Sequence, residues 1–143
     1  MIYGRRKGRE RAVQALYEVE FDTGTRPEQI RNRHLGKLQE DIREFAMRLF
    51  NGVMRNRDEL ESIITIGAER PWSRILPSTR APLKVGTYEI LFDDGIPDLV
   101  AIDEAIEIAK RFGGPSNGKI VNGVLDRILH QKKGLEHARM ENK

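Results

Sequence analysis

Residues 42–54 read IREFAMRLFNGVM, and their apolar side chains recur at steps of three and four. This spacing gathers them on one face of an α-helix, whereas a half-buried strand would alternate every second residue. The residues of that face are Ile42, Phe45, Ala46, Leu49, Phe50, Val53 and Met54. The stretch therefore indicates an amphipathic helix and a helical fold.

The same period recurs on both sides of this stretch. It predicts seven helices, at about 9–22, 27–37, 40–55, 58–68, 80–93, 98–112 and 116–130. Residues 83–92 are apolar almost all round, which is typical of a central helix. Because no segment alternates over enough residues to indicate a sheet, we predict an all-α fold.

The longest break in the helical pattern is ERPWSRILPS at 69–78. We expect it to separate two small packed bundles of a single domain spanning 1–143, one of about 1–70 and one of about 71–132. Pro82 fits a helix only near its beginning, so the fifth helix is expected to start at 79–82. Residues 133–143 lose the apolar period and are expected to form a frayed tail.

Composition excludes several classes of protein. The chain has 143 residues and no cysteine, which rules out disulfides, thiol catalysis and thiolate metal sites. No run approaches the roughly 18 apolar residues of a membrane span, and no signal peptide begins the chain. The three histidines have no metal-ligand spacing. We expect a soluble cytoplasmic protein without metal or cofactor.

Charge is unevenly distributed along the chain. Residues 5–11 carry five bases and one acid, whereas residues 98–109 carry four acids and no base. Tyr17 lies on the helix that follows the basic segment, where an aromatic ring could stack on an unpaired base. This pattern favours RNA binding, but a merely solubilising arm and a core role for Tyr17 both remain open.

Two enzymatic interpretations fail on the residues present. GGPSNGK at 113–119 resembles a phosphate-binding loop, but Ile120 stands where a magnesium-binding hydroxyl is needed, and a helix precedes the loop. Lys119 at a helix start could still hold one RNA phosphate. The carboxylates of Asp103, Glu104 and Glu107 are better explained as a solvated or partner-facing stripe than as acid–base catalysts. We therefore expect no enzyme.

Several motifs, in order, resemble the NusB family of bacterial transcription antitermination factors. They are RERAVQALY at 9–17, WSRIL at 72–76, YEIL at 88–91, IP at 96–97, IDEAIEIAK at 102–110 and KIVNGVLD at 119–126. The resemblance covers residues 5 to about 130. It implies an all-helical protein that binds boxA leader RNA together with the ribosomal protein NusE. The pair would then join RNA polymerase with other Nus factors during ribosomal RNA synthesis.

The resemblance also implies which residues contact RNA. They are Arg5, Arg6, Lys7 and Arg9 of the basic arm, Tyr17, the pair Arg80 and Lys84, and Lys119, Ile120 and Asn122. Ile120 replaces an aromatic residue common in relatives, so only apolar contact is expected there. Asn122 could equally cap a neighbouring helix, and Gly123 could permit close helix packing.

Two other functions remain open. Some NusB relatives dimerise, so the chain could be a homodimeric interaction module that hides its RNA face. Ribosomal RNA cytosine methyltransferases carry a similar helical domain, but this chain has no catalytic cysteine or nucleotide-binding strand.

Overall fold

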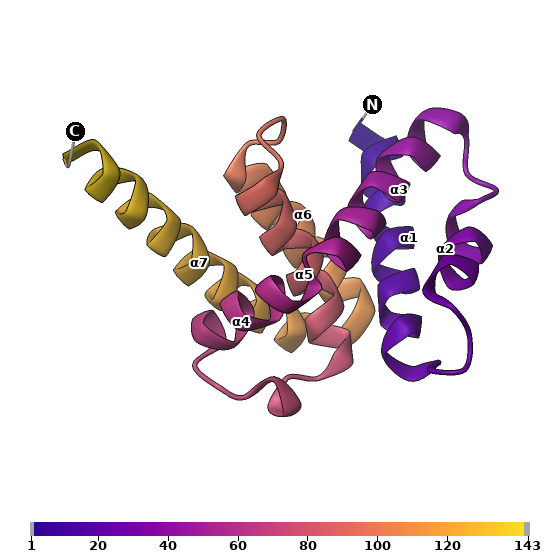
Figure 1. Cartoon of the computed structure of the whole chain (residues 1–143), viewed down its shortest axis with the longest axis horizontal. Helices are drawn as coiled ribbons and strands as arrows, with labels where there is room; N and C mark the ends of the chain where they lie inside the picture. The colour runs from indigo at the N-terminus through magenta and orange to yellow at the C-terminus, as the bar shows by residue number, and fades with distance from the viewer. Residues whose placement is uncertain (1, 142–143) are drawn as a thin grey trace.

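The computed structural model describes the backbone of residues 2–141 and the side chains of residues 4–141. This part of the chain forms seven α-helices, one short 3-10 helix and no strand, which confirms the all-α prediction (Figure 1). The helices are α1 (Ile2–Phe21), α2 (Pro27–Leu35), α3 (Glu40–Arg55), α4 (Arg57–Ala68), η1 (Trp72–Arg74), α5 (Pro77–Phe92), α6 (Asp98–Gly113) and α7 (Pro115–Glu141).

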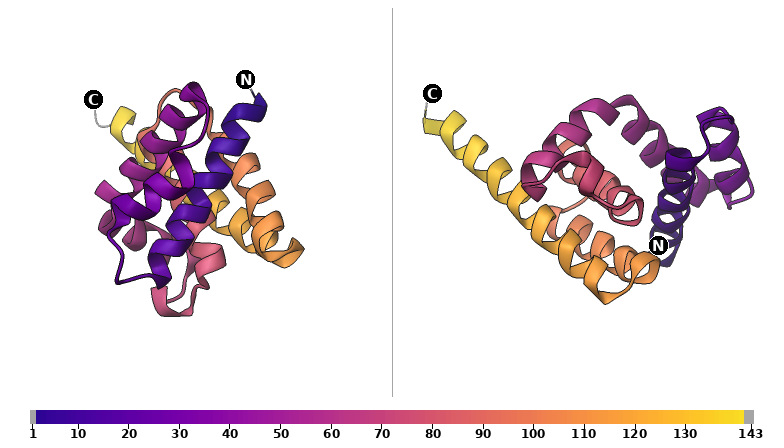
Figure 2. Two further views of the ribbon diagram at one scale, coloured as in Figure 1. Left: turned by 90° about the vertical axis from the view of Figure 1, so that its right-hand side faces the viewer. Right: turned by 90° about the horizontal axis from the view of Figure 1, so that it is seen from below.

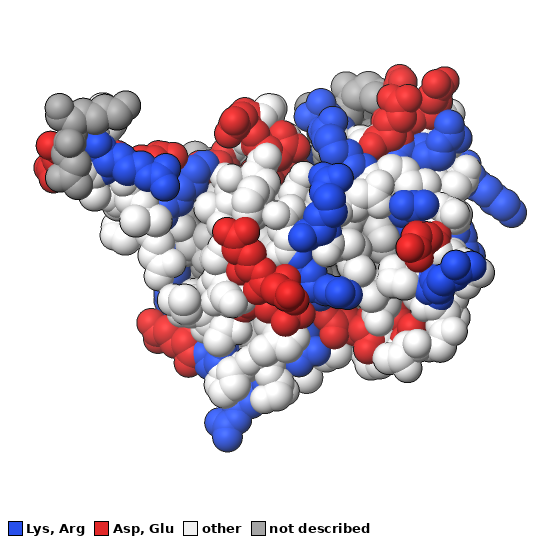
Figure 3. Space-filling model, in the orientation of Figure 1, with Lys and Arg blue, Asp and Glu red and all other residues white. Residues whose placement is uncertain are grey.

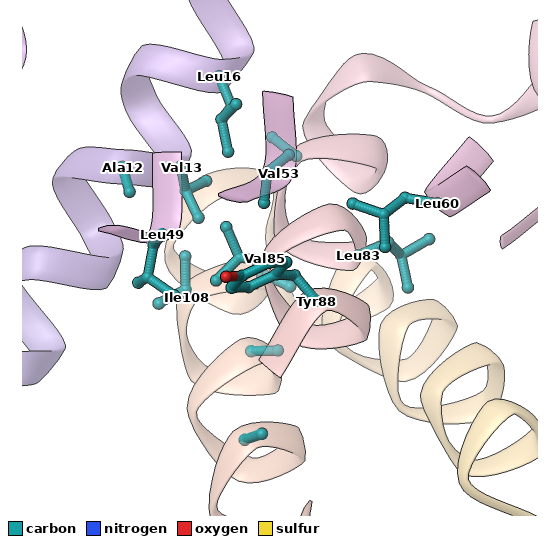
Figure 4. Packing of buried hydrophobic residues seen from close by; sticks show 14 of the residues in the cluster. Ala12, Val13, Leu16, Leu49, Val53, Leu60, Leu83, Val85, Tyr88 and Ile108 are labelled. Atoms are coloured by element: carbon teal, nitrogen blue, oxygen red, sulfur yellow. The ribbon is translucent and has the colours of Figure 1, made fainter. Parts of the chain in front are cut away.

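Helix α5 is the centre of the molecule, as its all-round apolar character predicts. Every residue from 81 to 90 is buried, and α5 packs against α1, α3, α4, α6 and α7. Side chains from the surrounding helices converge on it, close to the ring of its own Tyr88 (Figure 4). The core therefore surrounds one helix that has no face left for solvent.

The remaining helices form a layer around α5. Helices α1, α2 and α3 pack together on one side, and α6 and α7 form an antiparallel pair on the other (Figure 2). Helix α4 packs mainly on α5 and α7. The division into two bundles near residue 70 stays a prediction.

Three helix boundaries differ from the prediction. Helix α1 begins at Ile2, so the basic segment is helical and not an arm ahead of the helix. Helix α5 begins at Pro77, which leaves Pro82 inside it. Helix α7 continues to Glu141 and projects from the body as a single helix (Figure 1). Most of the predicted frayed tail is thus helical, and its last two residues, 142–143, lie outside the described part.

Two glycines allow the helices to approach closely. A Cβ on Gly52 of α3 would lie 2.2 Å from Cζ of Tyr88, and a Cβ on Gly86 of α5 would lie 2.8 Å from Leu125. Gly123 has nothing within 4 Å of a Cβ position, so the alternative that it permits close helix packing gains no support. None of the helices described is both long and apolar enough to span a bilayer.

Candidate nucleic-acid interface

The basic residues of α1 point in different directions because the segment is helical. Arg6 donates two hydrogen bonds to Glu104 of α6, both 2.9 Å long, and Arg9 donates two to Glu89 of α5, at 2.8 and 2.9 Å. Two of the four bases of α1 that were predicted to contact RNA are therefore ion-paired within the protein. They attach α1 to the helices beside it.

The Arg9–Glu89 pair is buried. The Arg9 side chain is 4% exposed and the Glu89 side chain 1% exposed. Burial raises the pKa of the Glu89 carboxyl group, and the hydrogen bonds from Arg9 oppose that rise. A guanidinium enclosed in this way has no surface to offer a phosphate, which favours a structural role for Arg9.

The Arg6–Glu104 pair lies nearer the surface. Hydrogen bonds from Arg6 lower the pKa of Glu104, and the same bonds raise the pKa of Arg6. Glu104 is buried, so it is not part of the solvated acidic stripe expected for this segment. Arg111 and Glu10 form a further ion pair between α6 and α1.

Arg5 and Lys7 are the predicted bases of α1 that remain exposed. The Arg5 guanidinium lies 5.2 Å from the centroid of the Phe45 ring. Lys7 has no ion-pair partner among the described residues, and the exposed Arg11 follows it one helical turn later on the same face. Arg5 lies on the side of α1 that faces α3, whereas Lys7 and Arg11 share the opposite, solvent-facing side.

Tyr17 belongs to an aromatic group at the junction of α1 and α6. Its ring meets Phe21 and Phe112 edge to face, with centroids 4.8 Å apart in each pair. Tyr17 is half-buried and Phe21 is 58% exposed. The core role and the contact role proposed for Tyr17 are thus compatible, because one side of the group packs and the other is open.

Arg80 and Lys84 converge on one carboxylate. Glu20 accepts a hydrogen bond from Arg80 at 3.0 Å and one from Lys84 at 2.9 Å. Both cations also lie over the Trp72 ring, at 4.7 and 5.3 Å from its centroid. Lys84 is buried. This group joins the end of α1 to α5 and to η1, which favours a structural role for both bases.

The start of α7 presents the other predicted contacts. Lys119, Ile120 and Asn122 are exposed. The side chain of Asn122 makes no hydrogen bond to any described residue, so the alternative that it caps a neighbouring helix gains no support.

Asn117 holds this segment in place, and sequence reasoning missed it. Its amide donates to the carbonyl oxygens of Ser78 (2.9 Å) and Ala109 (3.0 Å) and accepts from the Thr79 hydroxyl (2.6 Å). Ser78 lies four residues before Pro82, which has no N–H to donate to that carbonyl. Asn117 supplies the missing donor, and this explains how α5 tolerates an internal proline.

The exposed members of the predicted set come from neighbouring elements. Helix α1 and the turn between α6 and α7 lie side by side in all three ribbon views (Figures 1 and 2). On one face, a band of basic side chains runs between the N-terminal end of α1 and the α5–α6 loop (Figure 3). Within residues 4–141, no three His, Asp or Glu side chains lie close enough to hold a metal ion.

The sequence profile of the NusB family matches residues 6–130. The chain is 36% identical over 132 residues to the transcription antitermination protein NusB of Acetivibrio thermocellus, covering 90% of each protein. It is 37% identical over 131 residues to the NusB protein of Myxococcus xanthus, covering 87% of this chain and 93% of that one.

Solved structures agree with these matches. NusB of T. maritima superposes with a TM-score of 0.83 at 37% identity, over 92% of this chain and 96% of that one. A structure of the antitermination factors NusB and NusE with double-stranded RNA contains a chain with a TM-score of 0.83, over 92% of this chain and 99% of that one. That second chain is 24% identical, so its likeness concerns the fold.

Proposed function

The chain belongs to the NusB family of transcription antitermination proteins, and we propose that it binds boxA-type leader RNA together with the ribosomal protein NusE. The structure of NusB and NusE with double-stranded RNA supports this proposal, because that complex holds both ligand types around the same fold. Antitermination proteins of this family are not enzymes, and the proposed activity is binding alone.

The observation that carries the proposal is that some bases of α1 are ion-paired within the protein and others are exposed. Arg6 and Arg9 bind carboxylates of α6 and α5 and hold the helix rigidly. Arg5 and Lys7 remain exposed on a helix that these pairs hold in place, so each can offer its charge to a phosphate.

The start of α7 completes the proposed RNA surface. Lys119 would contact a phosphate, Asn122 would offer an amide to a base edge, and Ile120 would give apolar contact. Tyr17 would contribute the open side of its aromatic group. Arg6, Arg9, Arg80 and Lys84 act in this proposal by positioning helices and not by touching RNA.

In the cell, the complex with RNA and NusE would join RNA polymerase and other Nus factors during ribosomal RNA transcription. This role would operate in the cytoplasm, where the transcript emerges. The family relationship supports this part of the proposal.

A salt series tests the RNA surface directly. Binding of labelled boxA RNA is measured by fluorescence anisotropy with NusE present and absent, for the wild type and for Arg5→Ala/Lys7→Ala. Each lost phosphate contact reduces the salt slope of single-strand binding by about 0.7, so the double variant should lose up to about 1.4. The affinity should fall for all RNA sequences alike.

Arg26→Ala/Lys37→Ala is the matched control, because it removes two exposed bases at the two ends of α2. Its slope should equal that of the wild type. A slope that Arg5→Ala/Lys7→Ala leaves unchanged would show that neither Arg5 nor Lys7 touches a phosphate. A chain that is dimeric in solution and ignores boxA RNA even with NusE would instead be a homodimeric interaction module.

A further inference from the structure

A crevice of about 400 Å³ lies where α4 ends, α5 begins and α7 passes beneath them. Part of its wall is apolar and includes Ile75, Leu83 and Val124. Two apolar side chains stand at its mouth and are open to solvent, Leu76 at 66% exposure and Ile120 at 43%. The volume falls within the range of about 300–1,000 Å³ that is typical of ligand-binding clefts.

Four bases and one acid line this crevice. The bases are Arg70, Arg74, Lys119 and Arg127, and the acid is Glu69. Arg127 donates to the carbonyl oxygen of Gly67 at 2.9 Å. None of the four forms a salt bridge within the described part of the chain. Because the bases outnumber the acid four to one, the crevice carries a net positive charge, which favours an anionic ligand with an apolar portion.

The crevice is continuous with the proposed RNA surface. Lys119 and Ile120 belong to both, since they line the crevice and also lie on the exposed start of α7. The opposite rim consists of Arg70 and Arg74, on the segment that joins α4 to α5 at the lower edge of Figure 1. An RNA strand that runs past Lys119 would meet this rim next.

A nucleotide has both properties that the crevice requires. Its phosphate would be held by the basic rim, and its base would lie against apolar walls or on the plane of an arginine guanidinium. An acidic peptide with an apolar anchor has the same chemistry, but nothing connects a peptide to this rim in the way that Lys119 connects an RNA strand.

We infer that this crevice binds an unstacked nucleotide of the transcript outside the boxA segment. The inference rests on the proposed function and extends it. Residues Arg70, Arg74 and Leu76 would thus lengthen the stretch of single-stranded RNA that the protein holds.

Two RNA lengths test the inference. Anisotropy with NusE present compares a minimal boxA oligonucleotide with versions extended by about eight nucleotides on the 5′ or the 3′ side. One extension should strengthen binding to the wild type about tenfold, because two or more phosphates gain basic partners. Arg70→Ala/Arg74→Ala should abolish that gain and leave the minimal RNA unaffected. Glu69→Gln should increase the gain.

Arg55→Ala/Arg57→Ala is the matched control, because it removes two exposed arginines at the junction of α3 and α4, at the end of α4 away from the crevice. The inference is overturned if neither extension strengthens wild-type binding, or if the control loses the gain equally. It is also overturned if Arg70→Ala/Arg74→Ala weakens binding of NusE without RNA, since the crevice would then receive a protein. Failure of the minimal RNA to bind would overturn the proposed function and this inference together.

Discussion

Arg9 is held inside the molecule by the Glu89 carboxylate, 80 residues further along the chain. Removing one partner of a buried ion pair leaves the other charge without compensation, at a cost of about 3–5 kcal/mol. Replacing both partners with apolar residues of similar volume is often neutral. The pair therefore predicts a characteristic pattern of single and double variants.

Arg9→Met should lower the free energy of unfolding by about 3–5 kcal/mol, measured by urea denaturation. Arg9→Met/Glu89→Met should recover most of that loss. Lys7→Met is the control, since an exposed side chain on the same helix should change stability by less than about 0.5 kcal/mol. If Arg9→Met proves as mild as Lys7→Met, Arg9 does not hold the fold together.

The Arg6–Glu104 pair predicts a pH-dependent contribution to stability. Because Arg6 lowers the pKa of Glu104, the contribution is present above the ordinary glutamate value of about 4.5 and is lost as the pH falls through the lowered pKa. Arg6→Met should therefore cost about 1 kcal/mol at pH 7 and progressively less below pH 4.5.

Urea denaturation of wild type and Arg6→Met at several pH values measures this difference. Arg11→Met is the comparison, since Arg11 is exposed and has no ion-pair partner among the described residues. A difference between Arg6→Met and wild type that stays constant from pH 7 to pH 3 would contradict the prediction.

At the scale of the helices, the Tyr88 ring of α5 packs directly against Gly52 of α3. Gly123 on α7 has the opposite surroundings, with open space where a Cβ would lie. Glycine costs an exposed helix interior about 1 kcal/mol relative to alanine, whereas an added methyl group in a full core costs about 1–3 kcal/mol. The same substitution should thus have opposite effects at the two positions.

Gly52→Ala should destabilise the protein by about 1–3 kcal/mol, and Gly123→Ala should stabilise it by up to about 1 kcal/mol. Thermal unfolding of both variants beside the wild type measures the two shifts. Pairing Gly52→Ala with Tyr88→Leu should reduce the loss caused by the alanine, because the ring that the methyl group meets is gone. Equal shifts at the two glycines would contradict this account.

Helix positions could be predicted from the sequence because the recurrence of apolar residues at steps of three and four is a local property. Residues 42–54 and 98–112 show it clearly, and α3 and α6 form there. Local reasoning failed where the pattern weakens but helix continues, at the start of α1 and the end of α7. The position of Pro82 was misjudged because its compensating donor, Asn117, lies on another helix.

The candidate site could be predicted only in part, because the partners of its charged residues are also distant in the sequence. Nothing near residues 5–11 distinguishes Arg6 and Arg9 from Arg5 and Lys7. Their partners are Glu104, 98 residues away, and Glu89, 80 residues away, so only the tertiary structure separates paired from free bases. The residues that the family resemblance implies include both exposed side chains and side chains paired within the protein, and the resemblance did not separate the two groups.

At the scale of the whole molecule, α7 is the element that extends beyond the body. Lys132 is its last half-buried residue, and every residue from 133 to 141 is exposed. The Lys132 ammonium group donates to the Ile90 carbonyl oxygen at 2.7 Å and to Asp98 at 3.1 Å. Lys132 thereby connects α7 to the C-terminal end of α5 and to the N-terminal end of α6. The part of α7 beyond Lys132 contributes little buried surface.

A chain that stops after Gly134 should therefore unfold within about 0.5 kcal/mol of the full chain, because no buried contact is lost. Lys132→Ala should cost about 1–3 kcal/mol in either length, since it leaves the Asp98 carboxylate and the Ile90 carbonyl without their donor. Urea denaturation of the four proteins separates the two effects. A large loss on truncation alone would mean that residues 135–143 stabilise the body through contacts other than those of Lys132.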